Sequence, residues 1–168
     1  MAELTKEGDL VQNPALGAAI LWRAAAAYSK AAPDSKPIPL PLLFTILPLV
    51  LSSEYSQFLK TTSARSNLRN FVAKFSEASA SKTDLISALT QRCTAIRPLT
   101  LASLCVALNK QLLGLDAKTA SVYALSYAPP KVGIADNVQE LLGCAERLGI
   151  WYSELSIFEI CAALRIRL

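Results

Sequence analysis

The stretch Ile38–Leu51, IPLPLLFTILPLVL, constrains the fold most because it has three prolines and no charged residue. Its first two prolines suit the start of a helix, since proline fixes φ and has no N–H to leave unpaired there. Pro48 should kink or end that helix. A helix that is apolar on every side must be surrounded by protein or lipid, and fourteen residues fall short of the roughly 20 that span a bilayer. We therefore expect a central core helix with Phe44, Ile46 and Leu47 almost fully buried.

Composition indicates one domain that also contacts other proteins. A chain of 168 residues is long enough for a single domain with its own core. Hydrophobic residues make up 52% and charged residues 18%, against a usual charged share of about 25%. Some of the surplus apolar surface should therefore meet a partner protein.

The predicted fold class is mainly α: a single helical domain with a winged helix-turn-helix-like portion and a small β-wing. Residues 1–12 are polar and should form a flexible N-terminus. The helical domain should span residues 13–168. Within it we expect N-terminal helices over 13–82, a helix-turn-helix plus wing over 83–132, and C-terminal helices over 133–168.

Two apolar stripes of helical period predict the helix-turn-helix, one over about 84–96 and one over about 100–113. Arg97-Pro98 should form the turn between them. A strand pair over about 116–132 would complete the wing. The outward positions of the second helix carry a single charge, and a base-reading helix usually carries more Arg and Asn. This favours a scaffold for protein contacts over base readout, although both interpretations remain open.

Two tryptophans are candidate anchors at a protein interface. Trp22 lies in a predicted helix that begins at Asn13-Pro14 and runs to about Tyr28, with Asn as its cap and proline at its first position. The small residues of this helix should allow very close packing, and Trp22 belongs either to the core or to an interface. Trp151 lies at a predicted helix junction. Large aromatic side chains dominate many interfaces, so we predict that both tryptophans are interface residues.

The middle third of the chain concentrates positive charge. Residues 60–110 contain eight basic and two acidic side chains, which suits an anionic partner. The predicted helix 64–75 would place two arginines one turn apart. Three interpretations remain open: phosphate contact with DNA, contact with an acidic protein face, or a solvated helix surface. The candidate nucleic-acid-binding residues are Lys60, Arg65, Arg69 and Lys74.

The sequence argues against an enzyme. It contains no histidine, which excludes a Ser-His-Asp triad and His-based acid–base chemistry. No two of its four cysteines form a C-x-x-C pair, and its glycines form no phosphate-binding loop. We therefore predict no catalytic, cofactor-binding or metal-binding residues and no small-molecule substrate. The first ten residues lack the apolar segment of a signal peptide, so we predict a cytoplasmic protein without a membrane partner.

Several stretches, taken in order, give the chain a family resemblance. It resembles the middle component of three-component ABC systems, which include the small subunit of Lamassu-type bacterial anti-phage defence complexes. The residues that carry the resemblance extend over nearly the whole chain: Asn13-Pro14, Gly17, Leu21-Trp22, Pro39–Leu51, Arg65, Leu68, Arg97-Pro98-Leu99-Thr100, Ala145–Trp151 and Ile157-Phe158.

The resemblance implies a non-enzymatic adaptor subunit. Its partners would be an SMC- or Rad50-like ABC ATPase with a long coiled coil, and an effector, often a nuclease. The adaptor would dock on both and help couple DNA sensing to effector activation. The alternative is a free-standing winged-helix transcription regulator, which should form a symmetric dimer on a palindromic DNA site.

Overall fold

The computed structural model describes residues 13–78, 82–127 and 133–167. The predicted flexible N-terminus, residues 1–12, and the end of the predicted wing, residues 128–132, lie outside the described residues.

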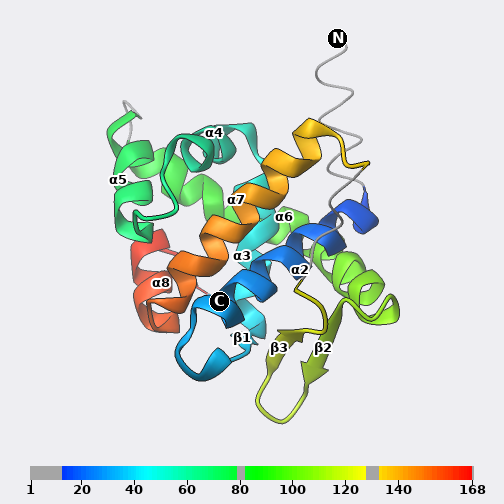
Figure 1. Cartoon of the computed structure of the whole chain (residues 1–168). Coiled ribbons are helices and arrows are strands. Elements are labelled where there is room, and N and C mark those ends of the chain that lie inside the picture. Colours follow the sequence, from blue (N-terminus) through cyan, green and yellow to red (C-terminus); the bar gives the residue numbers. More distant parts are fainter. Residues whose placement is uncertain (1–12, 79–81, 128–132, 168) are drawn as a thin grey trace.

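The described residues form a mainly helical protein with a small antiparallel sheet of three strands, which confirms the predicted fold class (Figure 1). Their hydrophobic side chains form one core cluster, and every α-helix contributes buried residues to it. The elements are α2 (Pro14–Ala31), η1 (Pro33–Ser35), β1 (Ile38–Pro39), α3 (Leu40–Leu51), α4 (Ser53–Thr61), α5 (Leu68–Ala78), α6 (Lys82–Asn109), β2 (Leu113–Asp116), β3 (Ser121–Ala124), α7 (Asp136–Ser153) and α8 (Ile157–Leu164).

Helix α2 crosses the centre of the fold and packs against both α6 and α7 (Figure 1). Its start matches the prediction, because the side-chain oxygen of Asn13 accepts hydrogen bonds from two backbone N–H groups of the first turn. The contact with α7 is close enough that a Cβ atom on Gly149 would overlap the carbonyl oxygen of Ala24. The small side chains of α2 therefore allow the approach that the sequence predicted.

Helix α3 is the predicted core helix. Ile46 and Leu47 are fully buried, as expected. Pro48 lies inside α3 and does not end it, because the helix continues to Leu51. The prediction for Phe44 is wrong: this ring is only partly buried, since it lies at the edge of the core, where the Arg97 guanidinium sits 5.7 Å from the ring centroid.

Helix α6 runs without a break through the predicted turn. The expected break at Arg97-Pro98 is therefore wrong, and the winged helix-turn-helix detail is not confirmed. Proline removes one backbone hydrogen bond, here the one to the carbonyl of Thr94. Both Thr94 and Pro98 are exposed, so water can replace that bond. One turn later, the buried Thr100 hydroxyl donates to the Ile96 carbonyl at 3.2 Å.

The sheet joins two distant parts of the chain. Its strand order is β1-β3-β2, with all pairs antiparallel. Strands β2 and β3 form a hairpin in which Leu113 is opposite Ala124. Strand β1 directly precedes α3, and its Ile38 pairs with Val122. A hairpin was predicted over 116–132, and the observed one starts earlier, at Leu113.

Two further features complete the fold. Ser156 and Glu159, which have the S-x-x-E spacing of a capping box, form one at the start of α8: the side chain of each accepts a hydrogen bond from the backbone N–H of the other. Among the described residues, no single helix is long and apolar enough to cross a membrane, whereas α3 and α4 taken together pass that test but are bent by 91°.

Candidate interaction surface

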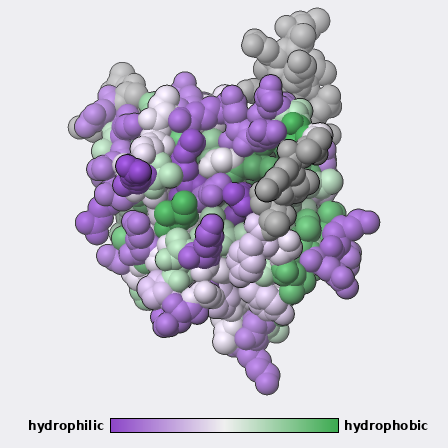
Figure 2. All heavy atoms as spheres, in the orientation of Figure 1, coloured by the Kyte–Doolittle hydropathy of each residue, from purple (hydrophilic) through white to green (hydrophobic). Residues whose placement is uncertain are grey.

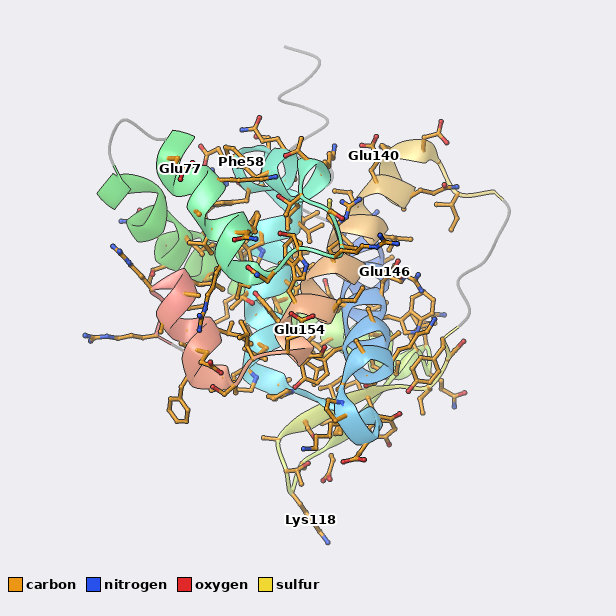
Figure 3. All side chains as sticks on the ribbon, turned by 60° about the vertical axis from the view of Figure 1, so that its left-hand side comes forward. Phe58, Glu77, Lys118, Glu140, Glu146 and Glu154 are labelled. Atoms are coloured by element: carbon orange, nitrogen blue, oxygen red, sulfur yellow. The ribbon has the colours of Figure 1, made fainter. Side chains whose placement is uncertain are left out.

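Two of the four predicted DNA-contacting residues form ion pairs between helices. The Nζ of Lys60 on α4 lies 2.8 Å from a carboxylate oxygen of Glu140 on α7, which Figure 3 labels. A guanidinium nitrogen of Arg69 on α5 lies 3.6 Å from Glu159 on α8. Such exposed pairs contribute only about 0–1 kcal/mol each to stability. The positive charges of Lys60 and Arg69 are nevertheless partly balanced by these carboxylates, so they are less available to an external anion.

Arg65 does not share a helix face with Arg69. Helix α5 begins at Leu68, so Arg65 lies in the preceding turn, and the predicted helix 64–75 is wrong at its start. The reason is local capping: the side-chain oxygen of Asn67 accepts a hydrogen bond of 2.9 Å from the backbone N–H of Asn70. An Asn that bonds to the N–H three residues later marks the start of a helix.

The other two predicted residues are exposed. The Nζ of Lys74 donates to the Thr61 carbonyl at 3.1 Å, which ties α5 to the end of α4. The Arg65 side chain has no hydrogen-bond or ion-pair partner in the described part of the chain. The four predicted residues therefore do not form one free cationic patch, and Arg65 is the most available of them.

The β-hairpin carries an exposed apolar face that the sequence analysis missed. We define the hairpin face as Tyr123, Leu125 and Tyr127, which are 42%, 52% and 51% exposed. Tyr123 lies in β3, the backbone N–H of Leu125 still donates to the Leu112 carbonyl across the hairpin, and Tyr127 follows just beyond the strand. Figure 2 shows hydrophobic side chains gathered next to the hairpin, over the end of α6. The signal was present, because apolar residues alternate with small ones in this segment, but periodicity does not say which side faces solvent.

The hairpin face is held in place from both ends. The ring of Tyr123 lies against Gly114 of the neighbouring strand, where any Cβ atom would overlap the ring. The indole N–H of Trp22 donates to the Ser126 carbonyl at 2.7 Å, which fixes the chain after β3 to α2. The face is therefore a preformed surface, which lowers the entropic cost of binding a partner.

A family model covers residues 1–168 of the chain and describes the ABC-three component (ABC-3C) system Middle Component 3. The chain belongs to this family. The match confirms the resemblance to middle components of three-component ABC systems, and the narrower Lamassu-type assignment stays a prediction. No curated protein and no solved structure matches this middle component.

Both predicted interface tryptophans lie inside the middle component. Trp22 is 5% exposed and Trp151 is fully buried. The indole N–H of Trp151 donates to the Ala64 carbonyl at 3.3 Å, and its ring centroid lies 5.7 Å from that of Phe71. Their contact with a partner stays a prediction, and in this conformation both side chains belong to the hydrophobic core.

Three cysteines of the middle component are partly or fully buried, which favours the protonated thiol. Burial raises the pKa of Cys93 to about 11 and raises that of Cys144 and Cys161. Thiols with raised pKa values are weak nucleophiles and weak metal ligands at neutral pH. Among the described residues, no group of three or more cysteine and carboxylate side chains is placed to hold a metal ion.

Proposed function

We propose that this middle component is a non-catalytic adaptor of a bacterial anti-phage defence complex, working in the cytoplasm. It bridges an SMC- or Rad50-like ABC ATPase and an effector of the nuclease type, and it helps couple DNA sensing to effector activation. The family match over the whole chain is the observation that carries the proposal, because a middle component works with other components. The bridging role and the kind of effector are inferred from the resemblance.

The hairpin face supports a docking role. Tyr123 and Leu125 lie on the short antiparallel hairpin, Tyr127 follows just after it, and each of the three is about half exposed. Tyrosine is enriched at binding hot spots because its large ring buries much area at a small cost in conformational entropy. We propose that this face contacts another component of the system.

DNA contact by the middle component is a separate part of the proposal. The candidate residues remain Lys60, Arg65, Arg69 and Lys74, acting on the phosphate backbone without sequence preference. Because two of them are already paired with glutamates, we propose a minor contribution to DNA binding, made chiefly by Arg65.

The rival proposal, a free-standing transcription regulator, is weakened by α6. A regulator of the helix-turn-helix class needs two helices joined by a short turn, and this segment is one continuous helix. Such a regulator would form a symmetric dimer and protect a palindromic DNA site in footprinting.

The test is reconstitution. The middle component is expressed alone and together with the ATPase and effector that its operon encodes, and assembly is followed by affinity capture and light scattering. The proposal predicts a ternary complex in which removal of the middle component separates ATPase from effector. A stable monomer without affinity for either protein would contradict it, and a DNA-bound homodimer would favour the rival.

A further inference from the structure

A pocket of about 300 Å³ opens between α3, α6 and the C-terminal segment of the chain. This volume is at the lower end of the range of about 300–1,000 Å³ for ligand sites. It could hold one or two side chains and is small for a nucleotide cofactor. We call it the C-terminal pocket and define it by the lining residues that matter here: Phe44, Cys93, Thr94, Arg97, Ile166 and Arg167.

The walls of the pocket are mainly apolar. Phe44 contributes a partly exposed ring, and Ile166, 6% exposed, closes another side. Cys93 is an uncharged thiol at neutral pH because burial raises its pKa. An apolar side chain entering the pocket would therefore exchange water for hydrocarbon contact, which is favourable.

The two charged lining residues are both arginines. Neither Arg97 nor Arg167 takes part in any ion pair of the described residues. The Arg97 guanidinium lies 5.7 Å from the centroid of the Phe44 ring, within cation–π range. Among the described residues the Arg97 guanidinium makes no hydrogen bond or ion pair, so its N–H donors can bind a carboxylate.

The ion-paired cations of the chain differ from these two arginines. Lys60 and Arg69 have glutamate partners within the chain, whereas the arginines of the C-terminal pocket have none among the described residues. Two positive charges that have no ion-pair partner among the described residues, beside a mainly apolar cavity, suit an occupant that is apolar and negatively charged at once.

We propose that the C-terminal pocket binds an acidic peptide segment of another component of the ABC system. An apolar side chain of that segment would enter the cavity beside Phe44, and a neighbouring carboxylate would bond to Arg97 and Arg167. The identity of the partner rests on the proposed function, whereas the chemistry of the occupant follows from the pocket itself.

A protein segment fits this site better than a nucleic acid. Nucleic-acid surfaces present a row of cations that follows the phosphate backbone, and this pocket has two arginines beside an open, mainly apolar cavity. The occupant needs hydrocarbon as well as negative charge, and an acidic peptide supplies both.

The first arm of the test uses overlapping 15-residue peptides that cover the co-encoded ATPase and effector, with binding measured by fluorescence anisotropy. Bound peptides should share an apolar side chain next to Asp or Glu. Arg97→Glu and Arg167→Glu should each weaken binding by about tenfold or more, because each turns attraction into repulsion. Thr94→Trp, at an exposed position on the rim, should block the cavity without disturbing the core.

Two matched controls accompany these variants. Lys118→Glu makes the same charge change at the hairpin tip, where the side chain points away from the body of the molecule (Figure 3). Gln57→Trp makes a similar increase in size at an exposed position of α4. Both should bind the peptides like the wild type, and thermal melting should show that all the variants are folded.

The second arm uses the whole complex and separates this inference from the proposed function. If the wild-type chain assembles and the two arginine variants lose one component, the pocket is the docking site. If all variants assemble normally and no peptide depends on the arginines, the inference is overturned while the adaptor role stands. If the arginine variants bind less DNA in a complex of unchanged composition, the occupant is nucleic acid and the inference is also overturned.

Discussion

The hydroxyl groups of Thr45 and Tyr152 lie 2.7 Å apart inside the core and join α3 to α7. Both side chains are fully buried. The Thr45 hydroxyl also lies 2.7 Å from the Leu42 carbonyl, to which it donates. The Tyr152 hydroxyl therefore donates to Thr45, and this pair satisfies both polar groups in an apolar environment where an unpaired group would be costly.

The two partners should respond unequally to mutation. Tyr152→Phe leaves the Thr45 hydroxyl bonded to Leu42, so it should cost about 1 kcal/mol. Thr45→Val leaves the Tyr152 hydroxyl buried without an acceptor, so it should cost about 1–3 kcal/mol. Urea unfolding of both variants measures the difference, and the double variant should cost less than the sum. Equal costs for the single variants would contradict this account.

Gly149 should be sensitive to a single added methyl group. In Gly149→Ala, the new Cβ atom would overlap the Ala24 carbonyl of α2, so helix α7 must move, and we expect a loss of about 1–3 kcal/mol. Gly143→Ala is the matched control on the same helix, because a Cβ atom there meets nothing within 4 Å. That control should gain up to about 1 kcal/mol from helix propensity. Chemical denaturation measures the free energy of unfolding of both variants. Similar changes in the two variants would contradict the close contact at Gly149.

The protein should lose stability at alkaline pH. Burial raises the pKa of Cys93 from 9.0 to about 11 and that of Tyr55 from 10.0 to about 12. The folded state holds these protons more tightly than the unfolded state, so their contribution is complete below pH 9 and disappears as pH rises through 11–12. The urea concentration at the unfolding midpoint should fall over this range. In Cys93→Ala, that midpoint should fall less between pH 9 and 11 than it does in the wild type. A urea midpoint that stays constant up to pH 12 would contradict the raised pKa values of Cys93 and Tyr55.

The hairpin face should be needed for assembly but not for folding. Leu125 is 52% exposed, so Leu125→Asp should leave the melting temperature nearly unchanged. At a docking surface it should weaken binding to another component by tenfold or more, equivalent to at least about 1.4 kcal/mol. Phe158→Asp, at an 83% exposed position on α8, is the control. Equal losses in both variants would mean that assembly depends on surface hydrophobicity in general.

Among the cationic residues, Arg65 should matter most for DNA. Arg65→Glu should weaken DNA binding by the assembled complex at low salt and reduce the salt dependence of binding. Lys60→Glu should act chiefly through repulsion from Glu140, so it should lower stability slightly. Filter binding at several salt concentrations, with Lys118→Glu as the control, measures the effect. Unchanged binding in Arg65→Glu would assign this residue to the solvated surface.

The sequence by itself determined the helical class, the cap at Asn13 and the capping box of α8, because these depend on local hydrogen bonds and on the spacing of apolar residues. It also determined that Ile46 and Leu47 are buried, since a segment without charges has no favourable alternative to the core. The family resemblance followed from motifs in their order along the chain.

Tertiary structure decided what local rules left open. Pro98 does not end α6, because the helix packs against other helices and this packing outweighs the loss of one backbone hydrogen bond. The carbonyl group that loses this bond can be hydrated. The partners of Lys60 and Arg69 are glutamates from α7 and α8, which no local pattern can place beside them. The C-terminal pocket brings α3, α6 and the last residues together, and such contacts between distant segments arise only when the chain folds around a shared core.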